Sequence, residues 1–148
     1  MSRKPPTASS PVAAPSAAAA QAIAEVKSLF YGGRIPAAIE RATAALALPA
    51  LSGEQRAELL ALRIEGWTAR IELERVAEDE AALQALAQRD RSATVQAWAL
   101  MRRAFAQTRQ GALAEGVASA RAGLQAAQRS GRAELVSRAL SFSRGCKF

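Results

Sequence analysis

Apolar residues recur every three or four positions in seven stretches between residues 16 and 142. This spacing places them on one face of an α-helix. The clearest example is residues 98–128, where two amphipathic segments flank the dipeptide Gln110–Gly111. Long alternating or β-branched runs, which would indicate strands, are missing from the chain. The pattern therefore predicts an all-α fold.

The first two predicted helices have clear boundaries. The first runs from near position 16 to Phe30 or Tyr31, and Gly32–Gly33 is expected to end it. Pro36 suits the first turn of the second helix, and Pro49 stops that helix.

The third helix begins at a recognisable cap, but its end is unmarked. Ser52 and Gln55 have the spacing of a capping box. A fourth helix is expected to start between Leu73 and Val76, although no glycine or proline separates it from the third. The alternative is one unbroken helix over residues 53–87, far longer than the usual ~11–12 residues.

Three further helices complete the prediction. Asp90 or Ser92 caps the fifth, Gly111 turns the chain into the sixth, and the seventh starts near Arg132 after a second glycine turn. The sixth helix has a stripe expected to face inward: Leu113, Val117, Ala120, Leu124 and Ala127. The seventh is apolar over a broad arc: Leu135, Val136, Leu140 and Phe142.

The turns indicate a repeat. Gly33 and Gly111 lie 78 residues apart, which is two units of 39, and a third turn fits midway near Glu72. Small and apolar residues follow both glycines at the same five spacings, which after Gly111 are Leu113, Gly116, Ala120, Gly123 and Leu124. Internal repeats of this length are typical of helical solenoids.

These residues resemble the tetratricopeptide repeat over about residues 20–143, with a unit longer than that family's usual ~34 residues. The resemblance implies a right-handed α-solenoid of antiparallel helical hairpins, with about three hairpins plus one extra helix. It also implies a concave groove, lined by the first helix of each hairpin, that binds a peptide or a helix.

Charge is distributed unevenly along the 148 residues. Residues 99–148 carry nine basic and two acidic side chains, whereas residues 1–98 carry eleven of each, so the net +7 lies wholly in the last third. This favours an acidic protein or peptide partner, and nucleic-acid binding is a less favoured hypothesis. The alternative is that arginine serves here mainly as a good helix former.

Several chemistries are excluded by composition. The chain has no histidine, which removes Ser-His-Asp and Cys-His catalysis and histidine-ligated metals. One cysteine, Cys146, permits no intrachain disulfide. The acidic run over residues 78–80 is interpreted as a solvated helix face. No enzymatic activity, cofactor or metal is therefore expected.

The chain divides into three parts: a disordered Pro/Ala/Ser-rich tail (1–17), the helical repeat domain (18–143) and a frayed C-terminus (144–148). No apolar run approaches the ~20 residues of a membrane span, and no secretory signal is evident. A cytoplasmic location without membrane contact is the expectation.

Candidate partner-binding residues are the aromatic, methionine and arginine side chains of the predicted first helices: Arg63, Trp67, Arg70, Trp98, Met101, Arg102, Phe105 and Arg109. Aromatic and methionine side chains are common binding anchors, although the same pattern is typical of interhelix core. If the two helices are neighbours, the four arginines form a cationic strip for carboxylate or phosphate groups. The alternative is that nearby glutamates, Glu58, Glu65 and Glu72, hold them in ion pairs.

The sequence therefore predicts a non-catalytic scaffold or adaptor module. The alternative is the truncated N-terminal regulatory or sensor region of a larger bacterial signalling protein, such as a nucleotide cyclase, a diguanylate cyclase or a transcription regulator. The broad apolar arc of the seventh helix favours that alternative, or a homodimer formed through this helix.

Overall fold

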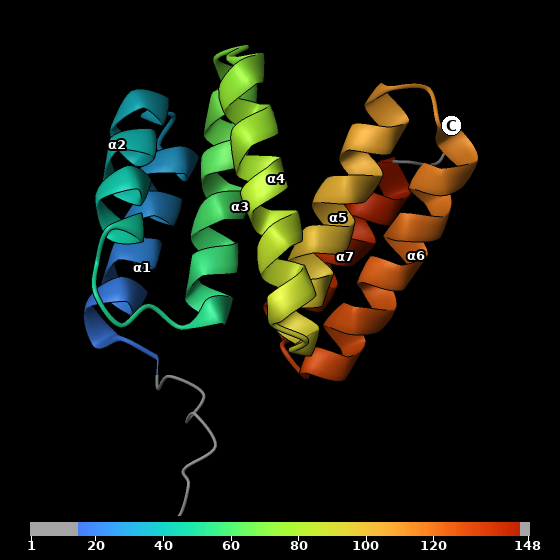
Figure 1. Cartoon of the computed structure of the whole chain (residues 1–148). Helices are drawn as coiled ribbons and strands as arrows, with labels where there is room; N and C mark the ends of the chain where they lie inside the picture. Colours follow the sequence, from blue (N-terminus) through green and yellow to red (C-terminus); the bar gives the residue numbers. More distant parts are fainter. Residues whose placement is uncertain (1–14, 146–148) are drawn as a thin grey trace, which may run out of the picture.

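The computed structural model describes residues 15–145, and this part of the chain is built of α-helices without strands (Figure 1). The helices are α1 (Ala17–Tyr31), α2 (Ile35–Leu46), α3 (Gly53–Ala69), α4 (Leu73–Arg89), α5 (Ala93–Arg109), α6 (Leu113–Ser130) and α7 (Ala133–Gly145). The predicted all-α class is confirmed.

Three turns share one backbone geometry. Gly33, Ile71 and Gly111 have φ angles of 73°, 58° and 86°, and each donates its N–H to the carbonyl three residues earlier. The N–H of the following residue reaches the carbonyl five residues back, and the next helix begins two residues after the turn. The predicted break before Leu73 is confirmed, and the alternative of one unbroken helix is wrong.

Serine hydroxyls cap the helices that precede these turns. Ser16, Ser52 and Ser92 each accept the backbone N–H three residues later. The predicted capping box of Ser52 and Gln55 is complete, and of the two candidates for the fifth helix Ser92 is the cap. The Gln55 amide also bonds the backbone N–H and C=O of Ser16 at 3.0 and 2.8 Å, which ties the start of α1 to α3.

The odd-numbered helices form a continuous contact series. Each helix packs against the next along the chain, and in addition α1 packs on α3, α3 on α5 and α5 on α7. The even-numbered helices α2, α4 and α6 make no such contacts with one another. In Figure 1 the helices stand side by side, from α1 and α2 at one end to α6 at the other. We call α1, α3, α5 and α7 the inner helices.

The core follows the inner helices. One buried cluster joins α1, α2 and α3, and a second extends from α3 to α7. Leu59 belongs to the first cluster and Ile64 to the second, and both are fully buried. Helix α3 therefore packs against other helices on both of its sides.

The predicted inward stripe of α6 is wrong in its first half. Leu113 and Val117 are 53% and 39% exposed. A Cβ atom on Gly116 would lie 2.5 Å from the Thr108 hydroxyl, and one on Gly123 would lie 3.4 Å from two side chains of α5. These glycines let α6 approach α5 so closely that the seam consists of small residues, and the larger apolar side chains are turned outward.

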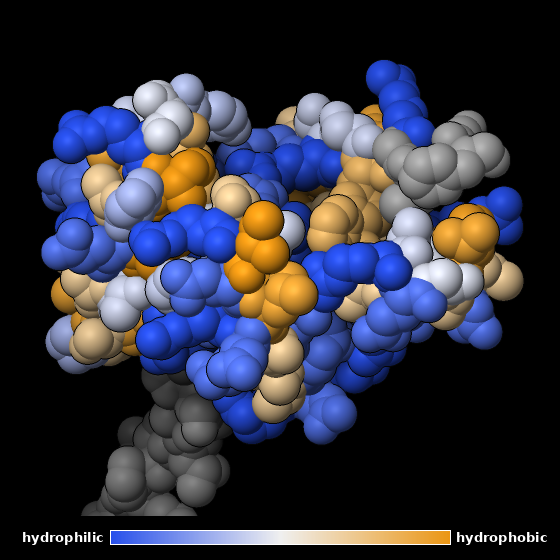
Figure 2. All heavy atoms as spheres, turned by 90° about the horizontal axis from the view of Figure 1, so that it is seen from above, coloured by the Kyte–Doolittle hydropathy of each residue, from blue (hydrophilic) through white to orange (hydrophobic). Residues whose placement is uncertain are grey.

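Apolar side chains also remain exposed at the turns between helices. Tyr31, Ile71, Leu73 and Leu113, all exposed, lie next to the three equivalent turns. Figure 2 is viewed from above Figure 1 and shows a largely hydrophilic surface with apolar side chains in separate patches. No described helix is long and apolar enough to cross a membrane.

The chain ends are only partly covered by the structure. The predicted tail lies outside the described residues up to position 14, and so does Cys146. α1 starts at Ala17, which was predicted to be the last residue of the tail. α7 extends to Gly145, two residues beyond the predicted end of the helical domain at 143.

Candidate functional site on the inner helices

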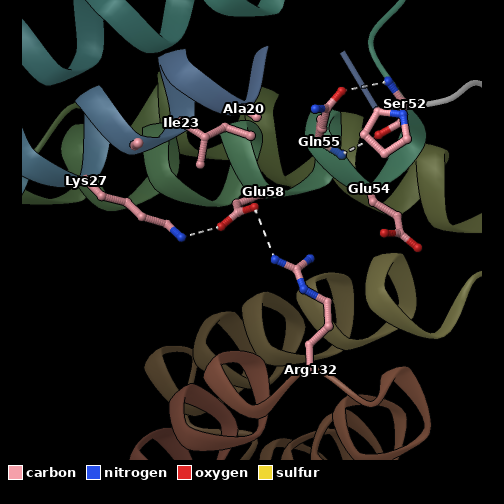
Figure 3. A pocket seen from close by; sticks show the side chains of 10 residues that line it. Ala20, Ile23, Lys27, Ser52, Glu54, Gln55, Glu58 and Arg132 are labelled. Atoms are coloured by element: carbon pink, nitrogen blue, oxygen red, sulfur yellow. Dashed lines mark hydrogen bonds and ion pairs between the residues drawn. The ribbon is translucent and has the colours of Figure 1, made fainter. Parts of the chain in front are cut away.

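Two cavities open between the inner helices. The amino-terminal cavity, about 360 Å³, lies between α1, α3 and the residue that precedes α7; its polar lining residues are Lys27, Ser52, Glu54, Gln55, Glu58 and Arg132 (Figure 3). The arginine cavity, about 370 Å³, lies between α3, α5 and α7; it is lined by Glu65, Trp98, Met101, Arg102, Ser137, Arg138, Ser141 and Phe142.

The charges of the amino-terminal cavity balance one another. Glu58 is buried, with Lys27 Nζ 2.8 Å and Arg132 Nη2 3.8 Å from its carboxylate oxygens, and Lys27 also reaches Glu134 at 2.7 Å. Figure 3 shows Lys27 and Arg132 approaching Glu58 from separate elements. Burial opposes the charge of Lys27, but its hydrogen bonds to Glu134 and Glu58 outweigh this and raise its pKa. The network joins the start of α7 to α1 and α3 and leaves no unpaired cation for an anionic ligand.

The arginine cavity has an excess of positive charge. Arg102 Nη2 and Arg138 Nη1 approach the same Glu65 oxygen, at 2.9 and 3.5 Å. Two guanidinium groups therefore share one carboxylate, which leaves a formal charge of +1. These three residues come from three different inner helices, so the packing of α3, α5 and α7 creates the cluster.

Arg102 is the least satisfied member of this cluster. Its side chain is only 12% exposed, and its Nε has no hydrogen-bond partner in the part of the chain described. Burial lowers the pKa of Arg102, and the nearby charge of Arg138 acts in the same direction, whereas Glu65 raises it. A buried guanidinium whose N–H donor has no partner is suited to bind an anionic group, which would accept that hydrogen bond.

Aromatic rings surround the two arginines. The Arg138 guanidinium lies 5.4 Å from the centre of the Trp98 ring, and the buried Nε1 of Trp98 also has no partner among the described residues. Phe142 lies 6.1 Å from Phe105, ring centre to ring centre, and Arg102 lies 5.7 Å from the centre of the Phe105 ring. The cavity thus combines cationic donors with apolar walls.

The structure brings some of the predicted partner-binding residues together. Trp98, Met101 and Arg102 line the arginine cavity. Phe105 and Arg109 lie next to it, with the Arg109 guanidinium 5.6 Å from the centre of the Phe105 ring.

The predicted strip of four arginines is not formed. Arg63 makes two bonds of 2.6 and 2.7 Å to the carboxylate of Asp79 on α4, and Trp67 Nε1 donates to the same carboxylate at 3.2 Å. Arg70 lies at the α3–α4 turn, 3.7 Å from Glu72. Arg63 and Trp67 are thus turned toward α4, because a buried acid there binds them both.

The acidic run over residues 78–80 differs from its prediction as a solvated face. Asp79 is buried beneath Arg63 and Trp67. Glu80 is half-buried, with Oε1 3.8 Å from Arg109 Nη2, and burial raises its pKa while Arg109 lowers it. Only Glu78 of the three is exposed.

The residues that α7 contributes to the cavity were missed by sequence reasoning. Arg138 lies 40 residues after Trp98, and Phe142 lies 40 residues after Arg102. The helix starts Ala93 and Ala133 are separated by the same interval. The signal that could have found them is this interval of 40 residues, which is close to the predicted repeat of 39.

Part of the basic excess of the last third is paired in space. Four of its nine basic side chains contact acids of α3 and α4: Arg102 and Arg138 with Glu65, Arg109 with Glu80, and Arg132 with Glu58. The expectation that nearby glutamates hold the four candidate arginines in ion pairs is confirmed for Arg102 with Glu65 and for Arg70 with Glu72. Glu58 pairs instead with Lys27 and Arg132. Among these ion pairs, only the Glu65 cluster of the arginine cavity leaves a positive charge over, because two arginines share one carboxylate there.

Within residues 15–145, no group of three or more acidic or cysteine side chains is placed to hold a metal ion. Comparison of the chain with protein-family models gave no match, and neither did comparisons with curated proteins and with solved structures.

Proposed function

We propose that this protein is a non-catalytic interaction module that binds an acidic peptide in the arginine cavity. The peptide presents a carboxylate to Arg102 and Arg138 and an apolar or aromatic side chain to Trp98 and Phe142. The observation that carries this proposal is the buried Arg102 guanidinium, whose Nε lacks a partner beside an open cavity.

The scaffold proposed for this function is a right-handed solenoid of three antiparallel hairpins plus α7, similar to tetratricopeptide repeats. Its support comes from the common turn geometry of Gly33, Ile71 and Gly111, spaced 38 and 40 residues apart. The exclusive contacts between successive inner helices also favour it, because a solenoid curves toward the side where its helices approach one another.

An acidic peptide fits the cavity better than a nucleic acid does. Nucleic-acid sites present many unpaired cations over a broad surface. Here Arg102 and Arg138 form one small cationic centre between aromatic rings, and Arg109 and Arg132 already contact carboxylates. A non-catalytic role is proposed because the chain lacks histidine and because the charged groups of this cavity are two arginines and the one glutamate that they share.

An array of random octapeptides probed with the full-length protein tests the proposal. We expect the bound peptides to be enriched in Asp or Glu next to an apolar or aromatic residue. Arg102→Gln should weaken binding of a selected peptide by about 10- to 100-fold, the usual effect of losing a charge-assisted hydrogen bond.

Arg103→Gln is a matched control, because this neighbouring arginine contacts Gln84 outside the cavity. It should leave peptide affinity within about twofold, since charges away from an interface contribute little. Selection of peptides without acids, or equal binding by the Arg102 and Arg103 variants, would contradict the proposal.

A further inference from the structure

A second groove lies between α6 and α7, away from the arginine cavity. Its volume is about 440 Å³, and its lining is Val117, Ala120, Arg121, Leu124, Leu140, Ser143 and Arg144. Leu140 is 41% exposed, and Val117 is similarly open. Val117 is turned toward this groove because Gly116 and Gly123 occupy the α5–α6 seam in its place.

The repeat indicates the shape of what covers this groove. Leu60, Leu100 and Leu140 occur at intervals of 40 residues on α3, α5 and α7. Leu60 is buried in the cluster that includes the α4 residue Leu83, and Leu100 lies against Gly123 of α6. In each of these two cases the following helix covers the leucine. Among residues 15–145 no helix covers Leu140 in this way, so the fitting occupant is a helix.

The charge of the groove indicates the chemistry of that helix. Arg121 and Arg144 flank the apolar floor, and neither makes an ion pair within the described residues. No acidic side chain lines the groove. The acid of α7 nearest in sequence, Glu134, is held by Lys27, whose hydrogen bond lowers its pKa.

We infer that the α6–α7 groove docks an acidic amphipathic helix of another protein. Its apolar stripe, at spacings of three and four residues, covers Val117 and Leu140, and its carboxylates pair with Arg121 and Arg144. A second copy of this chain is a poorer occupant, because its own α6–α7 face would bring the same two arginines and repel them. The helical form of the partner rests on the hairpin arrangement proposed above, but its docking does not depend on the arginine cavity.

A display library of helical peptides tests the inference with the full-length protein as target. Each 18-residue peptide carries a fixed leucine stripe, and its flanking positions are randomised among Glu, Gln and Lys. We expect the selected peptides to be enriched in Glu over Lys. Selection of basic or neutral peptides, or of none at all, would overturn the inference.

Three variants locate the binding of a selected peptide. Leu140→Ser and the pair Arg121→Glu and Arg144→Glu should each weaken it at least about tenfold, as loss of an anchor does. Arg129→Glu, an exposed change on α6 outside the groove, should have an effect below about twofold.

Two further measurements distinguish binding in this groove from binding in the arginine cavity and from self-association of the chain. Arg102→Gln should leave binding of the selected helix unchanged, so that failure of the arginine cavity as a peptide site is distinguishable from failure of this groove. Light scattering of the wild type should show no concentration-dependent association. Self-association that Leu140→Ser abolishes would assign the groove to a second copy and overturn the inference.

Discussion

Arg102 and Arg63 lie on successive inner helices, and the structure predicts opposite consequences when each is replaced by methionine. Arg102 is buried with an unsatisfied Nε, so its removal relieves a cost of about 1–3 kcal/mol. What is lost is an ion pair to the partly exposed Glu65, worth about 0–1 kcal/mol, and stacking on Phe105, worth about 0.5–1 kcal/mol. The net change in the free energy of unfolding is therefore between about −1 and about +2.5 kcal/mol, centred on a small gain.

Arg63→Met should destabilise the protein instead. Asp79 is buried and receives both of its shortest bonds from Arg63, so this substitution leaves its carboxylate with Trp67 Nε1 at 3.2 Å. Breaking a buried pair from one side costs about 3–5 kcal/mol, and we expect about 3 kcal/mol here.

Urea denaturation followed by circular dichroism at 222 nm measures both variants against the wild type. If the free energy of unfolding falls with urea concentration at the same slope in all three proteins, a shift of the urea midpoint reflects a change in stability alone. A loss of about 2 kcal/mol or more in Arg102→Met would mean that this arginine holds the inner helices together. Its free donor would then be no evidence for a ligand in the arginine cavity.

Three other substitutions test the packing and the electrostatics. Ile71→Gly should raise the free energy of unfolding by about 1 kcal/mol, because a β-branched residue is strained at φ 58°; an unchanged or lower midpoint in urea would contradict this. Gly66→Ala should lower it by about 1 kcal/mol, since a Cβ atom 2.5 Å from Ile39 Cγ1 outweighs the gain in helix propensity, and a higher melting temperature would refute the tight contact. Glu80→Gln should stabilise the protein at pH 7 but not at pH 4. Burial raises the pKa of Glu80 above its ordinary 4.5. The folded state therefore loses stability as the pH rises through that raised value, and glutamine removes this loss. Denaturation at the two pH values checks this, and an equal effect at both would contradict it.

Local signals in the sequence were sufficient for most helix boundaries. The Ser52 capping box, Pro36 and the turn glycines act through neighbouring backbone groups, so they can be read without knowledge of the fold. No glycine marks the turn at Ile71, so its position was predicted from the apolar pattern and from the spacing of the glycine turns on either side. The Ile71 backbone is strained in this conformation, and helix or turn propensities do not predict a β-branched residue there.

Features that depend on distant residues were not predictable in the same way. The stripe of α6 was read from the size of its apolar residues, but close packing on α5 favours Gly116 and Gly123 in the seam and turns Val117 outward. Asp79 lies in an acidic run typical of a solvated face. It is buried because Arg63, sixteen residues earlier, is brought to it by the α3–α4 turn.

The candidate site was predicted only in part, because some of its residues share one helix and others come from distant parts of the sequence. Trp98, Met101 and Arg102 share one helix, so their common face follows from helical spacing. Glu65 and Arg138 complete the cluster from α3 and α7, and only the packing of inner helices reveals that both arginines share a single carboxylate.

The most direct test of the central claim is an NMR titration that follows the arginine Nε–H resonances of the full-length protein. A peptide selected from the octapeptide array is the ligand, and Arg102→Gln and Arg138→Gln assign the two signals. We predict that Arg102 Nε–H, which has no partner in the described residues, shifts most on binding and that Arg63 Nε–H, already bonded to Asp79, stays unchanged. A peptide that binds without moving the Arg102 signal would contradict the account.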